Sequence, residues 1–142
     1  GVLQQCDCEI VVDAGSWKGE TAAFLAKANV VISSESFRDP SGHDIFSVKE
    51  CANAKKAMTR GEKPILLADS EIPVEPVACV DSLAAGDIFH GAFCFAYYHA
   101  RKDFKTALAY ASKIAGESVK YFGPREWAKK IEEFCFLLGT SC

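Results

Sequence analysis

Residues 81–89 of this chain read Asp81-Ser82-Leu83-Ala84-Ala85-Gly86-Asp87-Ile88-Phe89, and this stretch decides the fold. A segment rich in Val and Ala precedes it and predicts a strand that ends at Val80. The apolar residues after the second acid predict a helix over residues 88–100. Small residues let a backbone approach a ligand closely, and the free N–H groups of a helix start bind phosphate oxygens. The order strand, small-residue turn and helix therefore predicts an α/β fold with an anion site.

The acid in this turn adds a chemical function to the prediction. Asp87 can accept a proton from a hydroxyl group that lies beside bound phosphates. Phosphoryl transfer to an alcohol needs both a cradle for the transferred group and a base for the nucleophile. The alternative interpretation is structural: Asp81 or Ser82 caps the helix, and the alanines only pack against their neighbours.

The longer context favours the chemical interpretation. Residues 81–93 resemble the C-terminal signature of the ribokinase-like (PfkB) carbohydrate kinases, Asp-Thr-x-Gly-Ala-Gly-Asp-x-Phe-x-Gly-Ala-Phe. Residues 11–18 are similar to the strand and turn that open the second half of these kinases. Residues 59–62 resemble the Thr-x-Gly element along the nucleotide phosphates. Residues 71–77 resemble the segment that leads into the signature, and residues 121–123 the Gly turn that closes the nucleotide pocket.

The resemblance implies a ribokinase-like three-layer (αβα) fold around a Rossmann-like parallel sheet. It spans nearly the whole chain but only the C-terminal half of the family's fold. The family's N-terminal substrate motif and lid strands do not occur among the 142 residues, and the chain starts at Gly1. We therefore expect a fragment or processed piece. We assign residues 1–142 to a single domain, the nucleotide-binding and catalytic part of such a kinase.

The resemblance also implies roles for the residues of the signature. Asp87 would be the general base that takes the proton from a sugar hydroxyl. The backbone N–H groups of Ala84, Ala85 and Gly86 would form the anion hole for the transferred phosphoryl group. Ala84 departs from the family, which has Gly at this position. A Cβ is tolerated there if φ is negative and is costly if φ is positive.

Outside the signature, the resemblance implies further contacts with ATP and Mg²⁺. The nucleotide-binding residues would be Thr59, Gly61 and Gly123. The family often has an Asn-x-x-Glu motif that organises Mg²⁺-bound waters, whereas residues 33–37 read Ser-Ser-Glu-Ser-Phe and lack the Asn. Glu35 would then be the acid that reaches Mg²⁺ through water, or else a surface residue at a strand end. A monovalent cation near Ser82 is a third candidate cofactor.

Hydrophobic periodicity supports the α/β assignment. Strands are predicted over residues 9–13 and 29–32, and a loop over residues 37–44. Helices are predicted over residues 19–27, 45–53, 88–100 and 105–121, with a last helix that begins at Pro124 and presents Trp127, Ile131 and Phe134. This alternation of strands and helices predicts a parallel sheet that is covered on both sides.

Periodicity and resemblance disagree over residues 54–58. Ala54-Lys55-Lys56-Ala57-Met58 are good helix formers and would extend the helix that precedes them. The family resemblance requires instead a short strand that ends near Thr59. The stretch is also shorter than in the family, so one strand of the sheet would be stunted or missing.

Composition narrows the class of protein and its partners. Hydrophobic residues make up 49% and charged residues 25% of the chain, and the formal net charge is −3, which is typical of a globular protein. No basic stripe, bilayer-length apolar run or secretory leader is visible, so we expect no nucleic-acid or membrane partner and a cytoplasmic location. The expected partner is a small sugar-like substrate, with a homodimer as a candidate assembly.

The chain has seven cysteines, but none forms a C-x-x-C pair. Cys6 and Cys8 alone are a weak indication of a metal site, and the three histidines lack finger-like spacing. An odd number of cysteines without a leader predicts reduced, mostly buried thiols.

Three functions are compatible with these observations. The first is the nucleotide-binding and catalytic half of an ATP-dependent sugar kinase. The second is a degenerate relative that binds a nucleotide or a protein without catalysis. The third is an interaction module whose exposed sheet edge pairs with another chain. The acid Asp87 in its small-residue turn favours the first, because a purely structural turn does not need it.

Overall fold

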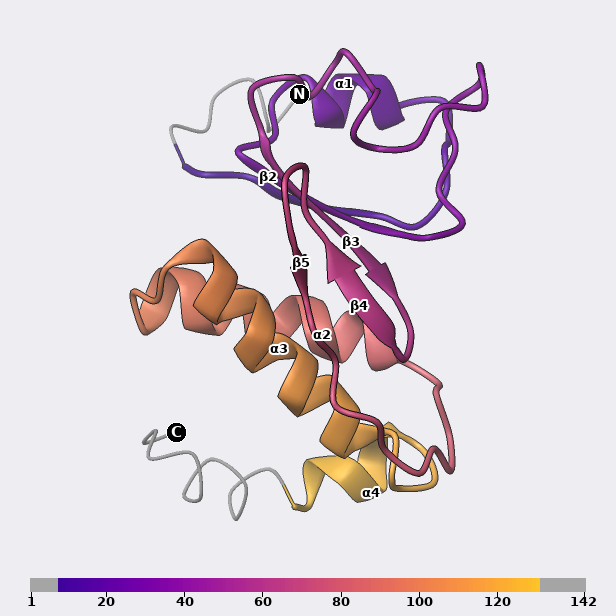
Figure 1. Cartoon of the computed structure of the whole chain (residues 1–142), viewed down its shortest axis with the longest axis vertical. Coiled ribbons are helices and arrows are strands. Elements are labelled where there is room, and N and C mark those ends of the chain that lie inside the picture. The colour runs from indigo at the N-terminus through magenta and orange to yellow at the C-terminus, as the bar shows by residue number, and fades with distance from the viewer. Residues whose placement is uncertain (1–7, 131–142) are drawn as a thin grey trace. The chain divides into compact units, whose positions relative to one another are not determined.

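The computed structural model describes residues 8–130, and the chain divides into two compact units between Pro73 and Val74. The first unit carries a sheet of five strands in the order β1-β2-β3-β4-β5. The strands are β1 (Val11–Ala14), β2 (Val30–Ser34), β3 (Lys55–Arg60), β4 (Lys63–Leu66) and β5 (Glu71–Ile72), and the short helix α1 (Thr21–Leu25) connects β1 to β2. Figure 1 labels α1 and the strands β2, β3, β4 and β5. The α/β class predicted from the sequence is confirmed.

The parallel part of the sheet follows from its apolar strands. β2 is buried from Val30 to Ser33, as a strand covered on both faces should be. It pairs in parallel with β1 and β3, with Val31 opposite Val12 and Lys56. Leu25, Phe37 and Ile45 are fully buried in the core cluster of this unit. The predicted strands over residues 9–13 and 29–32 are therefore confirmed, each shifted by one or two residues.

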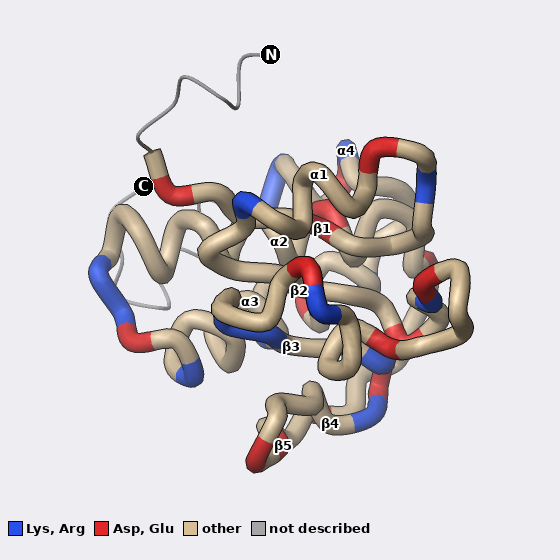
Figure 2. Tube along the Cα trace, turned by 90° about the horizontal axis from the view of Figure 1, so that it is seen from above, with Lys and Arg blue, Asp and Glu red and all other residues tan. Residues whose placement is uncertain are grey.

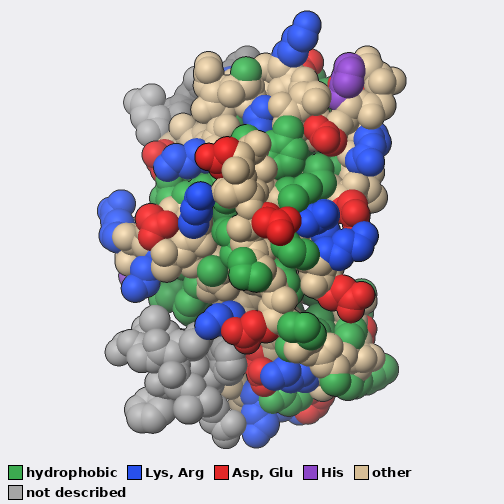
Figure 3. All heavy atoms as spheres, in the orientation of Figure 1, with side chains coloured by type: hydrophobic (Ala, Val, Ile, Leu, Met, Phe, Trp, Pro, Cys, Tyr) green, Lys and Arg blue, Asp and Glu red, His purple; other side chains and the backbone are tan. Residues whose placement is uncertain are grey.

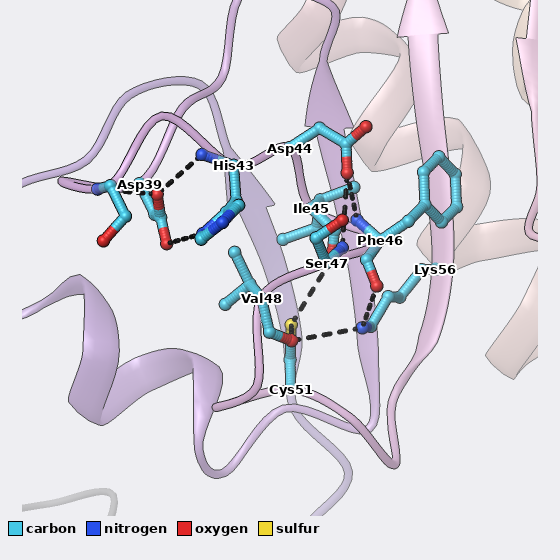
Figure 4. A network of polar contacts seen from close by, with 10 residues as sticks. Asp39, His43, Asp44, Ile45, Phe46, Ser47, Val48, Cys51 and Lys56 are labelled. Carbon is cyan, nitrogen blue, oxygen red and sulfur yellow. Dashed lines mark hydrogen bonds and ion pairs between the residues drawn. The ribbon is translucent and has the colours of Figure 1, made fainter.

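The predicted helix over residues 45–53 is wrong, although its start is capped (Figure 4). The carboxylate of Asp44 accepts hydrogen bonds from the N–H groups of Phe46 (3.0 Å) and Ser47 (3.2 Å), as the cap of a helix does. The Lys56 ammonium, however, donates to the carbonyl oxygens of Phe46 and Val48, each at 3.4 Å, and the backbone bonds of this segment join residues three positions apart. The segment is a series of turns.

Residues 55–60 form the strand β3. The family resemblance was therefore right for residues 54–58, and helix propensity was wrong. The sheet is parallel from β1 to β3, as predicted, whereas β3 and β4 pair antiparallel, as do β4 and β5. The reversal follows from the two-residue connection Gly61-Glu62. Gly61 has φ of +63°, the conformation that tight hairpins require at this position.

The second unit is helical. It contains α2 (Ala85–Cys94), the π-helical turn η2 (Phe95–His99), α3 (Phe104–Ser118) and α4 (Pro124–Ala128). α2 packs along α3, and Phe93 stacks on Tyr97 and meets Phe104 edge to face. The helix predicted over residues 105–121 is confirmed as α3, which buries a stripe that includes Leu108, Ala111 and Ile114.

Both ends of the helical unit meet the predictions in part. Pro124 occupies the first turn of α4 and Trp127 is buried, as predicted, whereas Ile131 and Phe134 lie outside the described residues. The predicted strand up to Val80 is wrong. Residues 73–79 have no regular secondary structure, Val80 is 62% exposed, and its N–H donates to the carbonyl of Val119 at the end of α3 (2.7 Å) rather than to a strand.

The cysteines follow the prediction only in part. Cys51 is buried, Cys94 is half-buried and both are free thiols, and burial raises the pKa of each above its ordinary value. Cys79 is free but exposed. Cys8 is disulfide-bonded, so the prediction of reduced thiols is wrong for this residue. Cys8 is also exposed, and burial does not protect it from oxidation.

Acidic and basic residues are interspersed along the trace (Figure 2). On the face shown in Figure 3, positively and negatively charged side chains lie next to one another. Among residues 8–130, no helix is long and apolar enough to span a bilayer.

Candidate functional site

The turn before α2 has the conformation of an anion cradle. Ala84 precedes the helix with φ of +61° and ψ of +9°, in the left-handed region, and Ala85 begins the right-handed helix. Such a change of hand turns successive N–H groups toward one side, which forms a concave anion site. The positive end of the helix dipole lies at the same place.

Three backbone donors of this turn are uncommitted. The N–H of Ala85 donates to the carbonyl of Ser82 (3.2 Å) and closes the turn. The N–H groups of Ala84, Gly86 and Asp87 donate to no acceptor among residues 8–130. Gly86 is exposed, and a Cβ built on it meets nothing within 4 Å. The cradle therefore has free donors and open space at the Cβ position of Gly86.

The carboxylate of Asp87 is also uncommitted. Asp87 lies in the first turn of α2 and is exposed. Within the described part of the chain its carboxylate has neither a hydrogen bond nor an ion pair. An acid that stabilises a fold normally pairs with a cation or caps a helix by accepting a backbone N–H. Asp103 is such a cap, since it accepts the N–H of Thr106 at the start of α3. Asp87 makes no such contact and is available to a ligand.

Asp81 connects the cradle to the predicted nucleotide-binding glycine. Its Oδ1 accepts a hydrogen bond from the N–H of Leu83 (2.9 Å), and its Oδ2 accepts one from the N–H of Gly123 (3.0 Å). Gly123 has φ of +75°, which favours glycine over any other residue. The structure thus brings Gly123 together with Asp81, the first residue of the signature.

The remaining predicted site residues gather in the first unit. Thr59 lies near the end of β3, and its hydroxyl donates to the carbonyl of Ser33 (3.2 Å). The carbonyl of Thr59 in turn accepts the N–H of Glu35 (2.9 Å). Gly61 follows in the hairpin after β3. Thr59, Gly61 and Glu35 are therefore neighbours at the ends of β2 and β3.

Glu35 has a cationic partner. The Lys63 ammonium lies 3.2 Å from its Oε1 and 3.3 Å from its Oε2, with both side chains about half exposed (58% and 49%). No group of three or more metal-ligating side chains occurs among residues 8–130. Mg²⁺ usually binds through one or two carboxylates together with substrate phosphates. A single carboxylate such as that of Glu35 is a ligand that Mg²⁺ can use when phosphates supply the other oxygens.

The contacts of two residues in these clusters were not predicted from the sequence. Asp81 was read only as a helix cap, although its bond to Gly123 spans 42 residues. Lys63 was not considered, although it pairs with Glu35. The signal for Lys63 was available, because a two-residue hairpin at Gly61 places Lys63 opposite Arg60, at the end of the strand that carries Thr59.

Comparisons with known proteins concern the family and the fold of the chain. The model of the pfkB family of carbohydrate kinases matches residues 4–131. No curated protein sequence matches the chain significantly. Ribokinase from Thermotoga maritima shares the fold with a TM-score of 0.71 at 20% identity, over 94% of this chain and 51% of that protein.

Two ligand-bound structures are also similar. Aminoimidazole riboside kinase from Salmonella enterica, complexed with aminoimidazole riboside and an ATP analogue, has a TM-score of 0.65 at 17% identity and aligns over 91% of this chain and 54% of its own. A putative ribokinase II from E. coli, in complex with ATP and Mg²⁺, has a TM-score of 0.56 at 24% identity, over 82% and 42%. The chain thus spans about half the length of the kinases that it matches.

Proposed function

Because this chain belongs to the pfkB family of carbohydrate kinases, we propose that it supplies the phosphoryl-transfer part of an ATP-dependent kinase. The acceptor is a hydroxyl group of a sugar or nucleoside. This substrate class is taken from relatives such as the ribokinase and the aminoimidazole riboside kinase that share the fold.

One observation carries the proposal. In the turn 84–87, three backbone donors and one carboxylate lie together at the positive end of α2, and none of them is used by the described part of the fold. Free donors at a helix start suit the oxygens of a phosphoryl group. A free carboxylate beside them suits the hydroxyl that attacks it.

The proposed mechanism assigns one task to each group. Asp87 removes the proton from the attacking hydroxyl. The N–H groups of Gly86 and Asp87, with that of Ala84, stabilise the negative charge that develops on the transferred group. The N–H of Ala85 shapes the turn through its bond to Ser82. The family resemblance assigns Thr59 and Gly61 of the first unit, and Gly123 of the second, to nucleotide binding.

Mg²⁺ bound to the phosphates would neutralise part of the charge that repels the nucleophile. Glu35 is the residue of the first unit that would hold it through water. The Lys63 ammonium occupies the same carboxylate, so metal-bound water must share Glu35 with it. A monovalent cation near Ser82, a homodimer and a cytoplasmic location stay predictions from the sequence.

Calorimetric titration of the intact protein with Mg·ATP, together with a kinase assay on ribose and ribosides, tests the proposal. Gly86→Val should weaken Mg·ATP binding, because the added methyl groups fill the space in front of the donors. Gly91→Val is the matched control, since Gly91 is also an exposed glycine of α2 with nothing within 4 Å of its Cβ position. Both changes affect helix propensity equally.

Asp87→Asn should lower the turnover rate on the order of 10²–10⁴-fold while ATP affinity is nearly unchanged. Retained turnover would exclude Asp87 as the base. Equal Mg·ATP affinity in Gly86→Val and Gly91→Val would mean that the phosphates bind somewhere other than this turn. Nucleotide binding without turnover for any acceptor would favour the second function, a degenerate relative that binds without catalysis.

A further inference from the structure

Asp81 differs from Asp87 in its surroundings, although both acids belong to the same turn. Asp81 is half-buried, and each of its carboxylate oxygens accepts one backbone N–H, from Leu83 (2.9 Å) and from Gly123 (3.0 Å). The first bond forms an Asx turn and shapes the approach to Ala84. The second bond crosses to the loop between α3 and α4.

The segment that carries Asp81 is itself fixed to α3. The N–H groups of Val80 (2.7 Å) and Asp81 (3.1 Å) both donate to the carbonyl of Val119, the residue that ends the helix. Val77 lies over Gly116 of the same helix, with its Cγ1 3.8 Å from the Cβ position. The backbone of Asp81 thus has a fixed position from which its carboxylate can hold two turns.

We propose that Asp81 is a positioning residue that ties the phosphate-binding turn 81–87 to the Gly123 turn, so that both parts of the nucleotide site keep one relative arrangement. This inference rests on the proposed function, because Gly123 and the turn act on a nucleotide only if the chain binds one. The bonds themselves lie within one unit and do not depend on the ligand.

Two variants distinguish a positioning role of Asp81 from a general contribution to the stability of the protein. Asp81→Ala removes both acceptors. Asp103→Ala is the matched control, because Asp103 also accepts a backbone N–H, that of Thr106 (3.1 Å), at the start of α3 and away from both turns. Both variants should lower the melting temperature of the intact protein. Only Asp81→Ala should weaken Mg·ATP binding, by about tenfold if one well-placed hydrogen bond is lost from the site.

Amide hydrogen exchange in a second variant, Asp81→Asn, tests the same role. This measurement depends neither on nucleotide binding nor on whether Asp81→Ala folds. Asp81→Asn keeps one acceptor oxygen and places an NH₂ group against one of the two N–H donors. Amide hydrogen exchange should then become faster at Gly123 or Leu83, while protection within α3 is unchanged. The control Asp103→Asn should leave both amides as they are in the wild type.

The outcomes distinguish the two proposals. Equal Mg·ATP affinity in Asp81→Ala and Asp103→Ala would overturn the positioning role. Unchanged exchange at Gly123 and Leu83 in Asp81→Asn would do the same. If the wild-type protein binds no Mg·ATP, the proposed function fails, and the exchange experiment still decides whether Asp81 holds the two turns together.

Discussion

Replacing Ala84 by Gly should stabilise the protein, although it removes a side chain from a helix cap. Ala84 has φ of +61°, and an L-residue in the left-handed region costs about 1–2 kcal/mol. Gly removes this cost but adds freedom to the unfolded chain, which offsets about 0.5–1 kcal/mol. The free energy of unfolding should therefore rise by about 0.5–1 kcal/mol, and the melting temperature by about 2–4 °C for a chain of this size.

A second residue provides the control for this prediction. Arg101 is exposed and has φ of +53° between η2 and α3. Arg101→Gly should give a similar gain, because the same backbone cost is removed. Urea unfolding of the wild type and the two variants measures both effects under identical conditions. A loss of stability in Ala84→Gly beside a gain in Arg101→Gly would refute the left-handed conformation at Ala84.

The Val variant extends the test. Ala84→Val should destabilise the protein, because a β-branched residue is less tolerated than Ala at positive φ. Mg·ATP binding should survive Ala84→Gly, since the change keeps the N–H groups of the turn in place. Loss of binding in this more stable variant would mean that the Cβ of Ala84, and not the backbone, contacts the nucleotide.

Three further predictions concern stability. The pKa of Asp103 is lowered by the hydrogen bonds from the Thr106 hydroxyl and N–H, so its contribution is complete above about pH 4 and is lost as the pH falls through the lowered pKa. Urea titrations at about pH 6 and about pH 2 should show that the free energy of unfolding falls less at the lower pH for Asp103→Asn than for the wild type. An equal fall in both proteins would contradict this. Ser33→Ala should stabilise the protein by about 1 kcal/mol, because the Ser33 hydroxyl is buried without a partner among residues 8–130. A loss of stability in this variant would mean that the hydroxyl has a hydrogen-bond partner. Lys56→Met should destabilise by about 1 kcal/mol by freeing two carbonyls of residues 45–53, and an unchanged denaturation midpoint would refute it.

The sequence predicted best those elements that depend on apolar pattern. β2 is a continuous apolar run and α3 has a clear stripe, and both formed where expected. Prediction failed where side chains bond to the backbone. The ammonium of Lys56 binds the carbonyl groups of Phe46 and Val48, and residues 45–53 form turns in place of the predicted helix. Such bonds leave no trace in hydrophobic periodicity.

The same distinction applies to the candidate site. The resemblance to a kinase signature located the turn and its small residues, and the left-handed conformation of Ala84 agrees with a position where the family has Gly. The bond from Asp81 to Gly123 could not be predicted from local pattern, because it joins residues 42 positions apart. The assignment of residues 1–142 to a single domain stays a prediction.

The two acids of the signature illustrate how one motif can combine structure and chemistry. Asp81 has both oxygens satisfied by backbone donors, so its removal should change stability and amide exchange along with ligand affinity. Asp87 has neither oxygen satisfied by the described chain, so its removal should change the rate of phosphoryl transfer and little else. If Asp87→Asn lowered stability as much as Asp81→Asn, the carboxylate of Asp87 would have a structural partner. Its assignment as a free base would then be wrong, because a base that is already bonded within the fold cannot accept the proton of a substrate hydroxyl without breaking that bond.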